Sequence, residues 1–289
     1  GANLWLATSN DSGKTFGEPS RVNAVPGAVV SFPEGRPIAV FGRSGELAVG
    51  WAGKGPGGRA VNVAVRASGD GGENFGAPVL VNDDAPLARP LPAAAGDSAR
   101  GRPRGPVANL YAFHGFPALA FLEDGALYAA WLDQRESAPG PPEPSTCAIY
   151  GATSSDGGQN WSVNAKVADS ACACCRPAAC GAAGDRVALA YRSGAADLRD
   201  PALTVSFDGG RSFAFDTLIS TDGWRLAGCP DQGPALVANR LRGGTYAWAT
   251  GAGTPGISVM PWRHDHGPAG LKRFISDSLR DARSPCLAS

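Results

Sequence analysis

Four copies of one eight-residue pattern constrain the fold of this chain more than any other feature. Each copy reads Ser-x-Asp-x-Gly-x-x-aromatic, and the copies are SNDSGKTF, SGDGGENF, SSDGGQNW and SFDGGRSF, beginning at Ser9, Ser68, Ser154 and Ser206. In this pattern the aspartate can accept backbone N–H groups of a turn, and glycine supplies a positive φ. The aromatic residue is then placed to enter the core. Because a catalytic residue normally occurs once, we interpret four aspartates as structural: Asp11, Asp70, Asp156 and Asp208.

Two further patterns recur in register with these turns. Apolar segments that end on an aromatic residue precede them, namely Leu47–Trp51, Tyr128–Trp131, Val187–Tyr191 and Tyr246–Trp248. Further upstream, a proline opens another apolar segment, at Pro37, Pro117, Pro177, Pro234 and Pro285. Proline is tolerated at the first residue of a strand. The repeating unit is therefore three strands, a turn and a fourth strand, which is one blade of a β-propeller.

The repeats predict an all-β fold of four-stranded antiparallel blades over 36–82, 116–167, 176–222 and 233–280. The last repeat has no Asp-x-Gly, and we interpret Gly256–Trp262 as its degenerate turn. The chain starts at a third strand, Leu4–Thr8, and stops inside a first strand at Pro285. We therefore expect a fragment of a longer propeller.

One long segment does not fit the repeats. Residues 83–112 are rich in proline, alanine and arginine and have no periodicity, which predicts an exposed insertion within a single domain, 1–289. The alternatives are a loop without fixed structure, which the composition favours, and a lid over the central site.

The repeated turns resemble Asp-boxes, the bacterial neuraminidase repeats of the sialidase superfamily. The resemblance covers nearly the whole chain. It implies a β-propeller, six-bladed in the full protein, and an exported glycosidase of the exo-sialidase type that needs no cofactor. It also implies a glycan or glycoprotein ligand and an extracellular or periplasmic location. We expect a monomer.

Charge and composition exclude other classes of function. Lys plus Arg and Asp plus Glu are both 26, so no net field favours nucleic acid. No apolar run approaches the roughly 20 residues of a membrane span. The runs of glycine lack the Gly-Lys-Ser/Thr ending of a phosphate-binding loop.

Candidate site residues lie just ahead of each first-strand proline, because those loops converge on one face of a propeller. They include Glu34, His114 and Asp231. A sialidase-type site uses arginines to bind the substrate carboxylate, since their planar forks match it. The candidates are Arg36 and Arg176, which align best, and a third arginine that could be Arg192, Arg199, Arg263 or Arg283. No nucleophilic Tyr–Glu pair is identifiable, and Tyr191 and Tyr246 occupy core positions.

Cysteines supply the second signal at these loops. Cys172 and Cys229 both lie five residues before their proline, so they occupy equivalent positions on adjacent blades. With Cys174 and Cys175 they could bind copper or zinc, which suit sulfur ligands. The alternative is disulfides from Cys172 or Cys174 to Cys229, with Cys147 and Cys180 as further partners. An exported protein favours the disulfides.

A non-enzymatic function remains the second hypothesis. Propellers of this type also bind proteins or glycans without hydrolysis, and a fold by itself does not fix a function. Cysteines in the loops, as disulfides or as a Cu/Zn-thiolate site, fit that hypothesis equally well.

Overall fold

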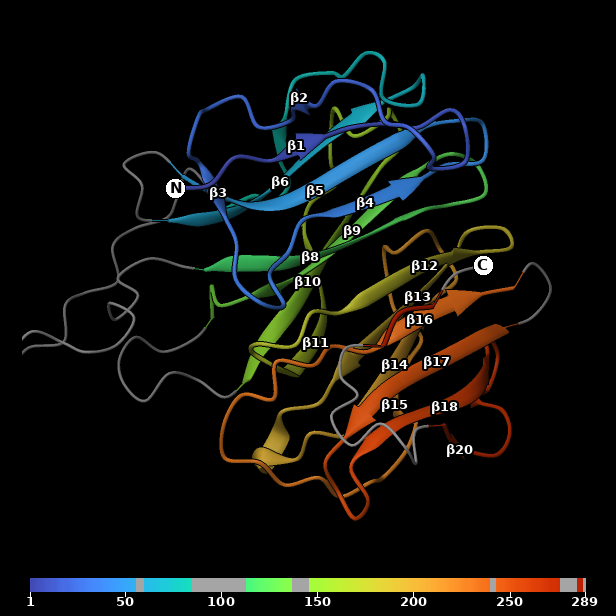
Figure 1. The fold of residues 1–289 in the computed structure, drawn as a ribbon. Helices are drawn as coiled ribbons and strands as arrows, with labels where there is room; N and C mark the ends of the chain where they lie inside the picture. Colours follow the sequence, from blue (N-terminus) through green and yellow to red (C-terminus); the bar gives the residue numbers. More distant parts are fainter. Residues whose placement is uncertain (56–59, 85–112, 137–145, 240–242, 276–284, 288–289) are drawn as a thin grey trace, which may run out of the picture.

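The computed structural model describes residues 1–55, 60–84, 113–136, 146–239, 243–275 and 285–287. Four antiparallel sheets follow one another along the chain, as the colours of Figure 1 show. A small two-stranded sheet, β1 (Trp5–Leu6) with β2 (Ser20–Arg21), precedes them. The described residues contain one short 3-10 helix, η3 (Ala195–Asp197), and no helix long and apolar enough to cross a membrane.

The four sheets match the four predicted repeats. The second consists of β8 (His114–Phe121), β9 (Leu127–Asp133), β10 (Thr146–Ser154) and β11 (Ala165–Cys172). The third consists of β12 (Ala178–Ala182), β13 (Arg186–Arg192), β14 (Pro201–Ser206) and β15 (Phe215–Leu218). Both are four-stranded and pair their strands in chain order, so the predicted unit is confirmed in them.

The first and fourth sheets each carry one additional short strand. The first has β4 (Ile38–Phe41), β5 (Leu47–Lys54), β6 (Val61–Ser68) and β7 (Val79–Leu80). Its additional strand, β3 (Val29–Val30), pairs with the same edge of β5 as β4 does, further along β5. The fourth has β16 (Ala235–Ala238), β17 (Gly243–Thr250), β18 (Gly256–Arg263), β19 (Gly267–Pro268) and β20 (Arg273–Phe274). The total of six blades stays a prediction.

The interpretation of Gly256–Trp262 as a degenerate turn was wrong. These residues form β18, the third strand of its sheet, which pairs with β17 along its whole length. The turn lies just after it, at 264–266. The segment contains a Pro, and no Asp-x-Gly marks the true turn, so the sequence did not locate that turn. Met260 and Trp262, on one face of the strand, are buried.

The core lies between successive sheets. Second-strand aromatics are buried as predicted, and Trp131, Tyr191 and Trp248 are at most 4% exposed. β8 contacts β4, β5 and β12, and β12 contacts β16, so the first strands of neighbouring sheets adjoin. Apolar clusters fill the spaces between the sheets, one of them around Trp131 and another around Trp248 and Trp262. This is how consecutive propeller blades pack.

The four Ser-x-Asp-x-Gly turns have one hydrogen-bond scheme. In the second, the Ser68 hydroxyl donates to Asp70 Oδ1 at 2.6 Å and accepts the Gly72 N–H at 2.9 Å. Asp70 Oδ1 also accepts the Asn74 N–H at 2.8 Å. The aromatic residue of the pattern packs against a core cluster in three turns, as Phe75, Trp161 and Phe213. Phe16 of the first turn is 64% exposed, so its expected core position was wrong.

The hydrogen bonds in these turns predict that the fold loses stability at acid pH. Hydrogen bonds from Ser68 and Asn74 lower the pKa of Asp70 from 3.8 to about 2. Because the folded-state pKa is depressed, the carboxylate stabilises the fold fully above about pH 4, and this contribution is lost as the pH falls through about 2. We expect Asp70→Asn to lower the urea midpoint of unfolding near neutral pH, with the difference from wild type disappearing near pH 2. Exposed Glu73→Gln in the same turn is the control. A difference that stays constant with pH would contradict this prediction.

Candidate functional site

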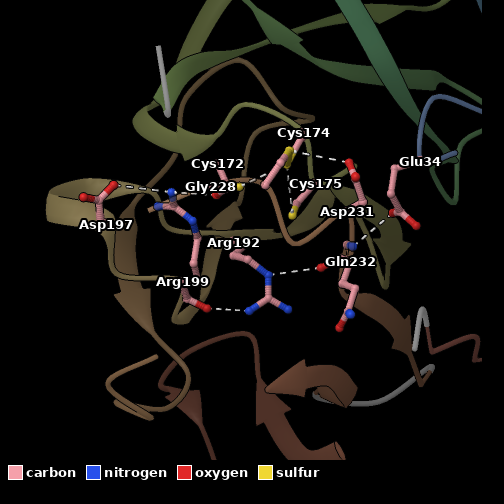
Figure 2. The surroundings of a disulfide bond; sticks show 12 residues. Glu34, Cys172, Cys174, Cys175, Arg192, Asp197, Arg199, Gly228, Asp231 and Gln232 are labelled. Atoms are coloured by element: carbon pink, nitrogen blue, oxygen red, sulfur yellow. Dashed lines mark hydrogen bonds and ion pairs between the residues drawn. A yellow bond between two sulfur atoms is a disulfide. The ribbon is translucent and has the colours of Figure 1, made fainter. Parts of the chain in front are cut away.

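Loops that lead into three first strands meet at one end of the sheets. Buried Glu34, ahead of β4, accepts the backbone N–H of Gly233, ahead of β16, at 3.0 Å. Arg176, ahead of β12, donates a long hydrogen bond of 3.5 Å to the carbonyl oxygen of Arg36. Segments almost 200 residues apart in sequence are thereby joined. We call this region the loop face; Figure 2 shows Glu34, Asp231 and the cysteines gathered there.

Two acidic and two basic side chains lie on the loop face. Burial raises the pKa of Asp231, and the nearby charge of Glu34 raises it further. Burial lowers the pKa of Arg176, while Glu34 opposes that shift. Arg36 is exposed. Glu34 is therefore close enough to Asp231 and to Arg176 to interact with both electrostatically, and Arg36 interacts with Arg176. Asp231 and Arg36 are open to solvent.

The cysteines lie beside Asp231: the Sγ atoms of Cys174 and Cys229 are within 4.8 Å of its carboxylate. The segment 172–175 forms a turn closed by a hydrogen bond from the Cys175 N–H to the Cys172 carbonyl oxygen at 3.3 Å. The turn places the Sγ of Cys174 at 3.6 Å from that of Cys172 and 4.0 Å from that of Cys175. A disulfide joins Cys174 to Cys229, with Cα atoms 6.1 Å apart. Of the two expected partners for Cys229, Cys174 forms the bond, whereas Cys172, the residue at the equivalent position, stays a free thiol.

The remaining cysteines are free thiols. Cys172 and Cys175 are buried beside the disulfide, and a hydrogen bond from the Cys175 thiol lowers the pKa of Cys172 to about 6. Burial raises the pKa of Cys175. Cys147 and Cys180 are also free, so the expectation that they form disulfides was wrong. They lie on β10 and β12 and contact different apolar clusters.

Two arginines beneath the cysteines bind backbone oxygens. Arg192 is 1% exposed and donates to the carbonyl oxygens of Gln232 at 3.0 Å, Ala249 at 2.8 Å and Arg199. Arg199, equally buried, donates to the carbonyl oxygens of Gly194 and Gly228, both at 3.1 Å. Because Arg192 is committed to these contacts, we leave it out of the proposed substrate contacts. Arg283 lies outside the described residues.

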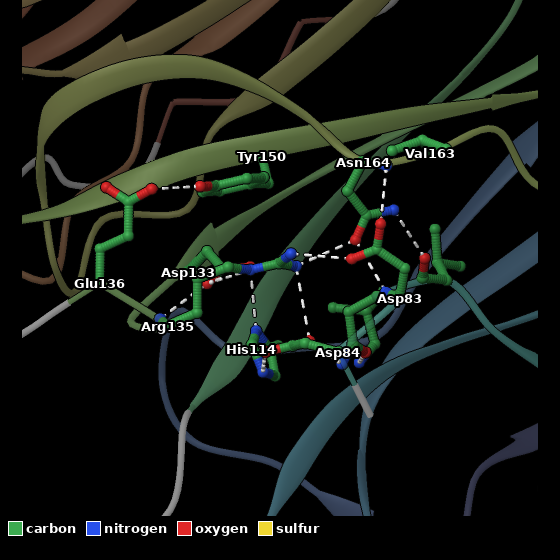
Figure 3. A network of polar contacts seen from close by, with 12 residues as sticks. Asp83, Asp84, His114, Asp133, Arg135, Glu136, Tyr150, Val163 and Asn164 are labelled. Carbon is green, nitrogen blue, oxygen red and sulfur yellow. Dashed lines mark hydrogen bonds and ion pairs between the residues drawn. The ribbon is translucent and has the colours of Figure 1, made fainter. Parts of the chain in front are cut away.

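His114 belongs to a buried network instead of the loop face (Figure 3). Its Nδ1 lies 3.0 Å from Asp133 Oδ2, and its Nε2 lies 3.2 Å from Asp84 Oδ2. Burial would lower the pKa of His114, but hydrogen bonds to both carboxylates outweigh it and raise the pKa. Arg135 adds ion pairs to Asp83 and Asp133. The network joins the end of the first sheet to the second, so we assign it a bracing role.

The structure contains two tyrosine–carboxylate pairs that the sequence did not reveal. The Tyr150 hydroxyl donates to Glu136, and the Tyr191 hydroxyl donates to Asp216. Burial, followed by Glu136, raises the pKa of Tyr150 to about 12, so its hydroxyl is protonated near neutral pH. Tyr191 and Asp216 line a groove of about 430 Å³ between the second and third sheets. No sequence signal could have found these pairs, whose members are 14 and 25 residues apart.

Comparisons with known proteins identify the fold. No family model and no curated protein matches this chain. Among solved structures, the α-L-arabinofuranosidase of Fusarium graminearum matches with a TM-score of 0.52 and 13% identity, over 90% of this chain and 67% of that one. The Penicillium chrysogenum α-L-arabinanase matches with a TM-score of 0.48 and 12% identity, over 92% of this chain and 68% of that one. A Hadza microbial sialidase matches with a TM-score of 0.46 and 19% identity, over 80% of this chain.

The resemblance inferred from the repeated turns is confirmed at the level of the fold, which is that of sialidase-like propellers. The chain spans 44% of the length of the sialidase it matches.

Proposed function

We propose that this protein is an exported, sialidase-like propeller that binds and hydrolyses glycans at the loop face. The observation that carries the proposal is the meeting of Glu34 and Asp231 with Arg36 and Arg176 where the loops ahead of the first strands converge. Glycosidases commonly cleave their bond with two carboxyl groups, one as proton donor and one as base or nucleophile. The propeller fold makes this face the place where a central ligand would bind.

Each residue has a proposed role. Exposed Asp231 donates the proton to the leaving group, and Glu34, held by the Gly233 N–H, acts as base or nucleophile. Arg36 and Arg176 bind a carboxylate of the sugar, which favours an acidic sugar of the sialic acid type. The Fusarium enzyme was solved with arabinobiose, so arabinofuranosides are the other substrate class to test. No step in this scheme requires a cofactor.

One observation favours a second candidate function, glycan binding without hydrolysis. The tyrosine–carboxylate pairs described above come from strands β10, β13 and β15 and a loop after β9, not from the loops of the loop face. A sialidase-type tyrosine nucleophile is therefore missing from the proposed contacts. Export is supported by the disulfide, since disulfides persist in oxidising compartments.

Hydrolysis of aryl glycosides tests the proposal. We expect the protein to release the aryl group from sialosides or arabinofuranosides, and Arg36→Ala and Arg176→Ala each to raise KM and lower kcat. The loss in kcat/KM should be about 10-fold to 200-fold, as for losing a charge-assisted hydrogen bond of roughly 1.5–3 kcal/mol. Arg43→Ala is the matched control. Arg43 follows β4, away from the loop face; it is 53% exposed and pairs with Glu123. Equal rates in all four proteins would remove both arginines from the site.

A further inference from the structure

The turn at 172–175 brings together three sulfur atoms that have no role in the proposed hydrolysis. The Sγ atoms of Cys172, Cys174 and Cys175 all lie within 4.8 Å of one another. Three sulfurs around one metal ion, each about 2.3 Å from it, would lie roughly 4 Å apart. The contacts of 3.6 Å and 4.0 Å already approach that spacing, so one ion needs little rearrangement to bind all three.

The surroundings favour a soft, singly charged ion. Thiolates select Cu(I) and zinc, but a structural zinc site is closed by four ligands in a tetrahedron. Here three sulfurs converge, whereas the sulfur of Cys229 groups with Cys174 and Asp231 and not with all three. Cys172 and Cys175 are 1% exposed, which excludes water. Three thiolates and Cu(I) carry a net charge of −2, and the guanidinium groups of Arg192 and Arg199 lie beside the cluster in Figure 2 to offset it.

We propose that Cys172, Cys174 and Cys175 form a Cu(I)-binding site whose access is controlled by Cys229. In the structure Cys174 is joined to Cys229, so one of the three sulfurs cannot act as a thiolate. A thiol reductant opens the site: two thiol molecules transfer two electrons and two protons to the Cys174–Cys229 disulfide and leave as their own disulfide. Cu(I) then displaces the thiol protons of the three ligands and binds. The site does not depend on the proposed hydrolysis.

Cu(I) titration against a coloured chelator, under nitrogen, tests the site. The oxidised protein should bind no Cu(I), and the protein reduced with dithiothreitol and desalted should bind one equivalent. Cys229→Ser, which leaves Cys174 as a thiol, should bind one equivalent without any reductant. Cys172→Ser and Cys175→Ser should each weaken Cu(I) binding by more than about 100-fold. Losing a residue that only hydrogen-bonds to a metal ligand already lowers metal affinity by about 10- to 100-fold, and these variants lose a ligand itself.

Matched controls keep the outcome decisive. Cys180→Ser removes a free cysteine from β12, outside the cluster, and should bind Cu(I) like wild type. Far-ultraviolet circular dichroism of each variant without metal confirms that it is folded. Binding by Cys172→Ser and Cys175→Ser at wild-type strength, or equal loss in Cys180→Ser, would overturn the proposal. Stoichiometric binding of Zn(II) but not of Cu(I) would also overturn it.

Discussion

Replacement of Arg192 by methionine is expected to lower the free energy of unfolding by at least about 3 kcal/mol, since each buried acceptor left without a donor costs roughly 1–3 kcal/mol. The guanidinium donates to three backbone carbonyl oxygens, those of Gln232, Arg199 and Ala249. These belong to the segment ahead of β16, the loop after β13 and the end of β17. Methionine fills the space but offers none of these hydrogen bonds. Urea unfolding at constant pH measures the change.

A second arginine of the same strand provides the control for this effect. Arg186 is partly exposed and donates to the carbonyl oxygen of Ala183 at 2.8 Å. Arg186→Met should cost less than about 1.5 kcal/mol, the net value of one ordinary hydrogen bond. Equal losses in the two variants would mean that Arg192 does not hold the third and fourth sheets together as we describe.

Replacement of Glu34 by glutamine is expected to reduce kcat/KM for glycoside hydrolysis by about 10²- to 10⁴-fold, the usual contribution of a general acid or base. Glutamine still offers an oxygen to the Gly233 N–H, so the loop contact at 3.0 Å should survive and KM should change little. The removed group is the negative charge that would activate water or attack the sugar. Steady-state kinetics on the best aryl glycoside measure the change.

Exposed Glu18→Gln, near the N-terminal end of the chain, is the matched control and should leave the rate unchanged. A Glu34→Gln protein with wild-type kcat would exclude Glu34 from the chemistry. If activity were lost instead in Asp216→Asn, the groove beside Tyr191 would be the catalytic site.

The strand order could be predicted because its signals are local. Each turn is specified within eight residues, and each second strand carries near its end an aromatic residue that becomes buried, such as Trp131. The fourth sheet shows the limit of this reasoning. Without an Asp-x-Gly to mark the turn, the boundary between β18 and the turn at 264–266 could not be located. β3 was missed because two valines give no periodicity.

The site was predictable only in its position along the chain. Alignment on the first-strand prolines identified the loops of Glu34, Arg176 and Asp231, because equivalent loops converge in a propeller. The side-chain roles depended on contacts across sheets. Cys174 and not Cys172 bonds to Cys229, since the turn at 172–175 decides which sulfur faces the next sheet. Nothing in the sequence showed that Arg192 is buried.

Glycan-array binding of the labelled Glu34→Gln protein tests most directly whether the loop face binds a glycan. We expect selective binding to one class of glycan, terminated by an acidic sugar or by arabinofuranose. The signal should be lost when Arg36→Ala and Arg176→Ala are added to this protein and kept when Arg43→Ala is added instead. Binding that persists without the two arginines, or no binding to any glycan, would contradict a glycan site at the loop face.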